Sequence, residues 1–373
     1  MKGADGMARA AAYGVGVEYV AADHIDALPA RLAMAGRAAI GLAVFGASPH
    51  EAIAALPRGL AALPCAAIEL QVLTGEAAWV EVWSMSHAGA PVVACETRGG
   101  IRYAASGDVL FAAIEIDEAR GVGALQSTTA DAYDALFTLL QETGFPHPLR
   151  FWNYLPDITL ETRVAEAAPS SERDRAIERY RCFNAGRQDA FLAHRRSIVD
   201  GAPAASALGT ARGATTIYVL AAKSPPIAIE NPRQVSAYRY PAQYGKRSPT
   251  FSRAALARVG TAQTLFISGT ASIVGHETVH RGDVAAQSEE TLNNIDALLD
   301  EVARIAGLRP EPDTLRLKVY VRHAAHLDAA RAIVARRLGP HVHAVYLRAD
   351  VCRSDLLIEI EAGATFDSRK GPA

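Results

Sequence analysis

The stretch LFISGTASI, residues 265–273, decides the fold, because it is an apolar strand pattern interrupted by Gly269. Periodic apolar residues and helix-ending glycines outline the elements that follow it. These are a helix over 288–305, a strand over 315–321, a helix over 325–338 and closing strands over 342–347 and 356–361. Strands that alternate with helices predict an α/β (α+β) fold.

The same order recurs in the first half of the chain. Leu110-Phe111 lies in an expected strand and precedes the helix start at 126–127, just as 265–266 precedes 287–288. The next strands are expected over 149–154 and 315–321, respectively. A spacing of about 155 residues indicates two related modules. Two ordinary α/β stretches that merely look alike are the alternative.

The composition is that of an ordinary globular protein, with 373 residues, half of them apolar and about a fifth charged. This length predicts two domains or one composite domain. A net charge of −2 indicates no general attraction to nucleic acid or to a membrane surface. The first residues lack a basic region followed by an apolar stretch, and no apolar run reaches about 18–20 residues. We therefore expect a cytoplasmic protein without a membrane span.

Signatures of metal and cofactor binding are missing from the sequence. The four cysteines form no C-x-x-C pair, and there is no P-loop, G-x-G-x-x-G, H-E-x-x-H or G-x-S-x-G motif. His276 and His280 are four residues apart, but no third ligand is evident. We therefore expect neither a metal nor an organic cofactor.

The middle of the chain contains three segments of different character. A helix expected over 171–194 carries Tyr180 and Arg187 on one face, where they can bind an anion or simply be solvated. Residues 201–213, rich in Ala, Gly and Pro, are typical of a linker or loop. Residues 231–253 combine three Tyr and one Phe with five Lys or Arg. This mixture suits a pocket for an anionic ring, an RNA-binding segment or a solvated loop.

Two acidic residues share one face of the last expected strand. Side chains alternate along LLIEIE, residues 356–361, so Glu359 and Glu361 lie opposite an apolar face. Solvent exposure is the ordinary expectation for such a face. If the face closes a cleft instead, burial raises the pKa of a glutamic acid and keeps it protonated, ready to act as an acid. Gly269 marks either a bulge or the close approach of a ligand.

Five stretches together make the chain resemble the chorismatases, which are related to 3-hydroxybenzoate synthases. They are RFWNYLPDI (150–158), ERYRCFNAGRQDAF (178–191), NPRQVSAYRYPAQYGKRSPTFSRA (231–254), SGTASIVGHET (268–278) and CRSDLLIEIEA (352–362). Residues 265–305 and the closing IEIEA also resemble the YjgF/RidA family. The first 75 residues carry no such resemblance.

The resemblance implies two RidA/YjgF-like modules, each a mixed sheet with helices packed on one side. A diverged module belongs to an N-terminal domain, residues 1–205. A C-terminal domain, residues 206–373, carries the catalytic acid. RidA proteins are trimers with sites between subunits, so the resemblance leaves a monomer or a trimer open for this chain.

The resemblance also implies an activity: the release of pyruvate from chorismate without a metal or organic cofactor. Chorismate is a small dianionic cyclohexadiene with an enolpyruvyl ether. Glu359 matches the acid that protonates the enolpyruvyl methylene. The family's ligand-binding residues match Tyr180, Arg187, Tyr240 and Arg253, and we add Gly269 to the expected substrate-binding residues.

Cys352 matches the position that separates the branches of the family, and we include it among the catalytic residues. Cysteine resembles the 3-hydroxybenzoate branch, and alanine resembles the branch that hydrolyses chorismate to the dihydroxycyclohexadiene carboxylate. A third branch with similar residues also makes 4-hydroxybenzoate. A small buried hydrophobe is the alternative reading of Cys352.

Two further functions stay open. A RidA-like imine deaminase is disfavoured, because Ala344, fifteen residues before Glu359, stands where that activity uses an arginine. The non-enzymatic alternative is a module of the same fold that binds RNA or a metabolite, for which residues 231–253 are the best support. Our expectation is an enzyme with a small-molecule substrate and no nucleic-acid or membrane partner.

Overall fold

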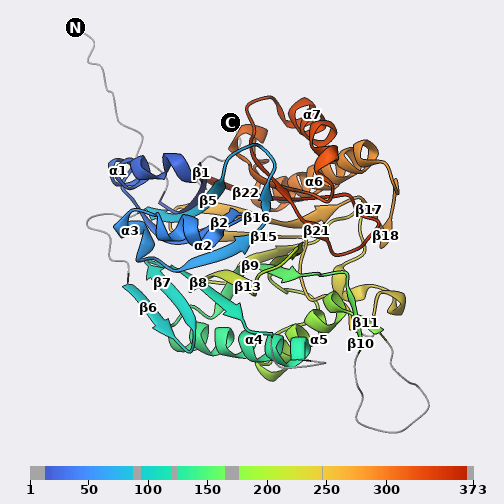
Figure 1. Ribbon diagram of the computed structural model, residues 1–373, viewed down its shortest axis with the longest axis horizontal. Helices are drawn as coiled ribbons and strands as arrows, with labels where there is room; N and C mark the ends of the chain where they lie inside the picture. The colour runs from blue at the N-terminus through green and yellow to red at the C-terminus, as the bar shows by residue number, and fades with distance from the viewer. Residues whose placement is uncertain (1–12, 87–93, 119–123, 164–175, 246, 368–373) are drawn as a thin grey trace.

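The computed structural model describes residues 13–86, 94–118, 124–163, 176–245 and 247–367, and Figure 1 shows its arrangement. Within these ranges the chain forms one four-stranded sheet, two seven-stranded sheets and two small two-stranded ribbons. The α/β fold predicted from the alternating pattern is confirmed.

The middle sheet has seven strands in the order β21-β12-β9-β13-β8-β7-β6. Helices α4 and α5 pack on one of its faces through a core rich in aromatic side chains. The bounds are β6 Ala94–Arg98, β7 Ile101–Ser106, β8 Val109–Ile116, α4 Ala124–Glu142, β9 His147–Pro156, α5 Arg179–Ala193, β12 Ala204–Thr210, β13 Thr215–Ala222 and β21 Asp350–Val351.

The C-terminal sheet also has seven strands, in the order β14-β15-β16-β22-β19-β20-β4, and α6 and α7 pack on one face. Asp283 caps α6 by accepting a hydrogen bond from the Ala286 amide, and Gly307 ends it in a left-handed conformation. The bounds are β4 Gln71–Val72, β14 Ile227–Ile229, β15 Ala254–Val259, β16 Ala262–Ala271, α6 Val284–Ala306, β19 Arg316–Val321, α7 Leu327–Leu338, β20 His343–Arg348 and β22 Ile358–Asp367.

The N-terminal segment forms a third, smaller sheet in the order β1-β5-β2-β3, with three short helices against it. The bounds are β1 Val15–Ala21, α1 Leu28–Met34, β2 Arg37–Gly46, α2 Pro49–Ala54, α3 Arg58–Ala61, β3 Cys65–Glu69 and β5 Ala78–Ser86. The remaining elements are the ribbons β10 (Glu161–Arg163) with β11 (Ala176–Glu178) and β17 (Ile273–Val274) with β18 (Glu277–Thr278), and the 3₁₀ helices Ala22–Ala27, Ala237–Arg239, Ala242–Tyr244, Pro312–Thr314 and Ala324–His326.

All three sheets repeat one plan. The runs β1-β5-β2-β3, β8-β13-β9-β12 and β16-β22-β19-β20 each contain two antiparallel pairings followed by one parallel pairing. In each run the strand in second place is the last one in chain order. The predicted pair of modules is therefore confirmed, and the N-terminal segment adds a shortened third copy.

The three sheets turn their inner faces toward one common core, and their helices lie on the outside. In Figure 1, α1–α3 lie at the left, α4 and α5 at the bottom, and α6 and α7 at the top. Phe45, Trp152 and Phe266, one from each sheet, belong to the same buried cluster. Burial of this shared apolar surface stabilises the sheets against one another.

Two sequence-based expectations need correction. Residues 201–213 are not a linker, because they contain β12, which lies between β9 and β21. The division expected between residues 205 and 206 therefore falls within a strand of the middle sheet, and we propose a division after Ala222 instead. The helix expected over 171–194 begins at Arg179, after the ribbon strand β11, and residues 171–175 lie outside the described ranges.

Candidate active site

A cavity opens between α5 and the C-terminal sheet. Its two adjoining parts, of about 250 Å³ and about 40 Å³, are lined in common by Tyr180, Phe251, Gly269, Cys352 and Glu359. Arg187 lines the smaller part, and Tyr240 and Arg253 line the larger part. The structure therefore brings every residue that the sequence singled out for the site to one cavity.

Glu359 lies on β22, the strand between β16 and β19, opposite Ala271 and Tyr320. Its side chain is buried, and no described residue forms a hydrogen bond with its carboxyl group. Burial, reinforced by the negative charge of Glu361, raises the pKa of Glu359 to about 8. A carboxyl group of this kind is protonated at neutral pH and can act as a general acid.

Gly269 makes room for that carboxyl group. The register between β16 and β22 shifts between Ile267 and Thr270, so the glycine lies in a bulge. A Cβ at this position would lie 1.9 Å from Oε1 of Glu359 and 3.2 Å from Cβ of Ser206. The group that approaches Gly269 closely is thus the candidate acid itself.

Helix α5 supplies Tyr180 and Arg187 to the cavity, as their seven-residue spacing predicts. Gly186 lets this helix pack closely on α4, since a Cβ there would lie 2.1 Å from the Gln126 carbonyl oxygen. Burial, with a smaller contribution from Cys352, raises the pKa of Tyr180 well above its usual value. Tyr180 therefore stays a neutral hydroxyl that can donate a hydrogen bond.

Arg187 is buried and held in one orientation. Its Nε donates to the Tyr133 hydroxyl at 2.9 Å, and its Nη1 donates to the Thr250 carbonyl. The guanidinium carbon also lies 4.7 Å from the ring centre of Phe191. Nη2 is buried and has no hydrogen-bond partner among the described residues. A buried N–H group that lacks a partner is suited to an anionic ligand.

Arg253 lines the larger part of the cavity, next to Tyr240. Its Nη2 donates to the Tyr240 hydroxyl at 2.7 Å and to the Val235 carbonyl at 2.9 Å. Its Nε is buried and has no partner among the described residues. The cavity therefore has two fixed guanidinium groups, and each has donor capacity left for a ligand.

Sequence reasoning missed Arg353 and Tyr244. The Arg353 guanidinium carbon lies 4.1 Å from the ring centre of Tyr244 and 5.2 Å from that of Tyr240. Nη1 of Arg353 donates to the His276 carbonyl at 2.9 Å. The position of Arg353 directly after Cys352 is the sequence signal that points to it, and the aromatic composition of residues 231–253 is the signal for Tyr244.

Cys352 lies in the cavity wall with its thiol neutral. Burial, followed by the charge of Glu359, raises the pKa of Cys352 to about 12. A thiol with such a pKa is a poor nucleophile at neutral pH. Cys352 is thus suited to shape the space next to the acid rather than to form a covalent bond.

Other sequence-based candidates lie away from the cavity or make no site. Ala344 packs against the cluster under α6 and α7 instead of facing the cavity. Within the described ranges, no group of three or more His, Cys, Asp or Glu side chains is placed to hold a metal ion. No helix in these same ranges is long and apolar enough to cross a membrane.

The chain is similar to known proteins in sequence. Residues 81–221 match the family model described as chorismatase FkbO/Hyg5-like, N-terminal. The chain is 38% identical over 275 residues to a 3-hydroxybenzoate synthase of Streptomyces hygroscopicus, which covers 71% of this chain and 76% of that protein. It is also 38% identical over 271 residues to a chorismatase of Streptomyces rapamycinicus. This match covers 70% of this chain and 76% of that protein.

A solved structure is similar over nearly the whole chain. The crystal structure of a chorismatase, 30% identical in sequence, matches with a TM-score of 0.77 over 95% of this chain and 99% of that chain. Because the two Streptomyces relatives are 38% identical and are covered to 76% of their length, the chain belongs to the chorismatase family.

Proposed function

We propose that this protein converts chorismate to pyruvate and 3-hydroxybenzoate, with Glu359 as the general acid. The observation that carries the proposal is a buried carboxyl group with a pKa raised to about 8, in a cavity lined by the guanidinium groups of Arg187 and Arg253. The names of the two curated relatives, a 3-hydroxybenzoate synthase and a chorismatase, support this choice of reaction.

In the proposed reaction, Glu359 donates its proton to the methylene carbon of the enolpyruvyl group. The oxygen of the neighbouring ring hydroxyl then bonds to the ring carbon that carries the ether, the ether bond to this carbon breaks, and pyruvate leaves. The bond between the hydroxyl oxygen and its original ring carbon breaks next, so the hydroxyl remains on the former ether carbon. The ring loses one proton as it becomes aromatic, and this proton restores Glu359. Pyruvate and 3-hydroxybenzoate together contain all the atoms of chorismate, so the sequence of steps consumes no water and needs no oxidant.

Arg187 and Arg253 are proposed to bind the two carboxylates of the substrate. Each has a buried N–H group without a partner among the described residues. A charge-assisted hydrogen bond contributes about 1.5–3 kcal/mol, because the alternative is a desolvated cation. Tyr180 and Tyr240 add hydroxyl groups on the same walls, and Gly269 keeps the floor next to Glu359 open.

The neutral thiol of Cys352 is proposed to favour the 3-hydroxybenzoate product. It occupies space beside the acid, where a water molecule would otherwise attack and give the dihydroxycyclohexadiene carboxylate. Additional formation of 4-hydroxybenzoate is compatible with the same cavity. We further propose that the protein is a cytoplasmic monomer, since three copies of one plan within a single chain replace the subunits of a ring.

Product analysis tests the proposal. Purified protein is incubated with chorismate, and pyruvate and the aromatic products are separated by chromatography. We expect equal amounts of pyruvate and hydroxybenzoate, with 3-hydroxybenzoate as the main product. Equal amounts of pyruvate and the non-aromatic diol would assign the hydrolytic branch instead. Pyruvate release no faster than in buffer alone would refute the proposed function.

A further inference from the structure

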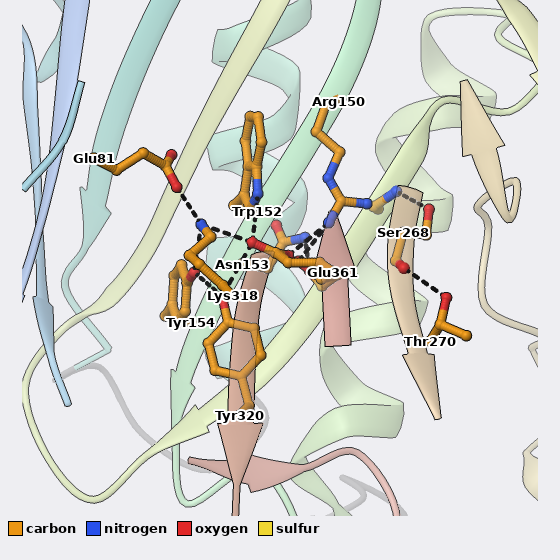
Figure 2. A network of polar contacts seen from close by, with 12 residues as sticks. Glu81, Arg150, Trp152, Asn153, Tyr154, Ser268, Thr270, Lys318, Tyr320 and Glu361 are labelled. Carbon is orange, nitrogen blue, oxygen red and sulfur yellow. Dashed lines mark hydrogen bonds and ion pairs between the residues drawn. The ribbon is translucent and has the colours of Figure 1, made fainter. Parts of the chain in front are cut away.

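The other acidic residue of the same strand face, Glu361, lies in a different environment from Glu359. Figure 2 shows Glu81, Arg150, Lys318 and Glu361 directed toward one another where the three sheets meet. Oε2 of Glu361 lies 2.7 Å from Nη2 of Arg150, and Oε1 lies 2.7 Å from Nζ of Lys318. All four charged side chains are buried. Glu361 is therefore a paired carboxylate in the centre of the protein.

Neutral donors complete the shell around Glu361. Ser206 Oγ donates to Oε2 at 2.8 Å, Trp152 Nε1 donates to Oε1 at 3.0 Å, and the Tyr320 hydroxyl donates to Oε1 at 3.1 Å. Burial acts to raise the pKa of Glu361, but the charges of Lys318 and Arg150 outweigh it and lower that pKa. The two cations thus favour the ionised form of Glu361.

Lys318 joins Glu361 to the N-terminal sheet. Its Nζ lies 2.5 Å from Oε2 of Glu81 on β5 and donates to the Tyr218 hydroxyl on β13 at 2.9 Å. Glu81, Tyr218 and Glu361 thus come from β5, β13 and β22, the strands in second place of the three runs. One lysine therefore contacts the equivalent strand of each module.

Glu361 lies two residues from Glu359 on the same face of β22, roughly 6 to 7 Å along the strand. Resting on the proposed role of Glu359 as the acid, we propose that Glu361 is a positioning residue whose fixed negative charge keeps Glu359 protonated between turnovers. It touches no substrate, because it lies in the closed centre and does not line the cavity.

The other titratable groups that face Glu359 do not favour its protonated form. They are Arg150 of β9, Arg253 before β15, Arg322 after β19, Tyr180 of α5 and Cys352 after β21. The three arginines favour the ionised form of Glu359, and the phenol and the thiol are neutral. Burial and the negative charge of Glu361 are therefore the two influences that oppose loss of the proton from Glu359.

The test is the protonation of Glu359 in the Glu361→Gln variant. It is followed without substrate by infrared titration of the carboxylic acid band that Glu359→Gln removes, and with chorismate by the pH dependence of kcat. We expect the titration midpoint of Glu359 to move down by about one to two pH units from about 8. The reason is that the substitution removes the negative charge of Glu361 at a distance of roughly 6 to 7 Å. An unchanged midpoint in a folded variant would overturn the proposal.

Two further variants separate the charge of Glu361 from a structural role. Tyr320→Phe removes a hydrogen bond to the same carboxylate but no charge, so its midpoint should stay at the wild-type value. If Glu361→Gln does not fold, the double variant Arg150→Met/Glu361→Gln removes a whole ion pair and leaves Glu81 paired with Lys318. The titration midpoint of Glu359 in this variant should move down by less than the shift expected for Glu361→Gln. A midpoint that stays or rises in this double variant contradicts the proposal.

The two readouts also distinguish this inference from the proposed function. Wild-type protein that releases no pyruvate but shows the infrared shift would refute the reaction and keep the electrostatic role of Glu361. Wild-type protein that turns over chorismate while Glu361→Gln leaves both midpoints in place would keep the reaction and refute that role.

Discussion

The cavity beside β22 has a counterpart beside β13, and the two differ at one decisive position. β19 and β9 each contain an R-x-x-x-Y stretch, which ends at Tyr320 and Tyr154, respectively. In the sheets, Tyr320 pairs with Glu359 and Tyr154 pairs with Thr216. Thr216 is buried, donates to the Ala67 carbonyl, and lines a cavity of about 260 Å³ between the N-terminal and middle sheets. The repeated plan thus forms a similar hollow twice, and only one of these two contains an acid at this position.

The comparison shows that the repeated fold provides the hollow, and we propose that single side chains provide the chemistry. The cavity beside Thr216 has Arg102, but this guanidinium group is committed to backbone carbonyls such as Leu63, 2.8 Å away. In the cavity beside Glu359, by contrast, Arg187 and Arg253 each keep a free donor among the described residues.

The largest effect is expected from Glu359→Gln, which keeps the shape of the side chain but removes the acid. We expect kcat to fall by at least about 10²-fold, the lower range for general acid catalysis. Thr216→Val at the equivalent position is the matched control, and it should leave chorismate turnover within about twofold of wild type. Near-normal kcat in Glu359→Gln would remove this residue from the mechanism.

Arg253→Gln should come next, because it removes one of the two proposed carboxylate partners. A loss of about 1.5–3 kcal/mol corresponds to a roughly ten- to hundredfold rise in KM for chorismate. Arg258→Gln, an exposed residue of the following strand β15, is the control and should leave KM unchanged. Equal effects of the two substitutions would show a general influence of charge rather than a specific contact.

Gly269→Ala should have a smaller effect, through the position of the acid. Its Cβ would lie 1.9 Å from Oε1 of Glu359, so the carboxyl group must move. We expect about a tenfold loss of kcat and a lower Tm, since overpacking costs about 1–3 kcal/mol. Gly363→Ala on β22 meets neighbours only at 3.7 Å or more and serves as the control in both measurements.

The last prediction concerns stability rather than turnover, and it leaves kcat and KM aside. Because the folded-state pKa of Glu359 is raised to about 8, the unfolded chain loses this proton at lower pH than the folded one. The free energy of unfolding should therefore fall between about pH 4.5 and 8, by up to about 1.4 kcal/mol per pH unit from this group. Denaturant titrations should show this fall in wild type and lose its Glu359 contribution in Glu359→Gln. Parallel curves would contradict the raised pKa.

Much of the fold could be predicted from local patterns, because the helices and strands of the two larger modules are long and periodic. Strand alternation also placed Glu359 and Glu361 on one face. It favoured solvent exposure for that face, whereas both side chains are buried. Arg150, which pairs with Glu361, and Glu81, which shares Lys318 with it, lie more than 200 residues earlier in the chain. No local pattern can therefore reveal that the face meets two other sheets.

Strand β12 shows why composition misled the prediction for residues 201–213. Its residues Ala204, Ala205 and Ser206 are small because the strand is buried between β9 and β21 and borders the cavity. Ser206 also hydrogen-bonds to Glu361, which is 155 residues away in sequence. An Ala- and Gly-rich stretch is typical of loops, and only tertiary contacts distinguish it from a tightly packed strand.

The position of β22 has a consequence for how the chain matures. Although it follows β16 and β19 in sequence, it lies between them in the sheet. During synthesis, therefore, β16 and β19 emerge from the ribosome with unpaired inner edges, which are prone to pair with other chains. The insertion of β22 closes this gap and delivers Glu359 and Glu361 in the same step. A nascent chain that stalls before this strand lacks both a finished sheet and the proposed acid. If Glu359 has the proposed role, completion of the fold and onset of activity coincide.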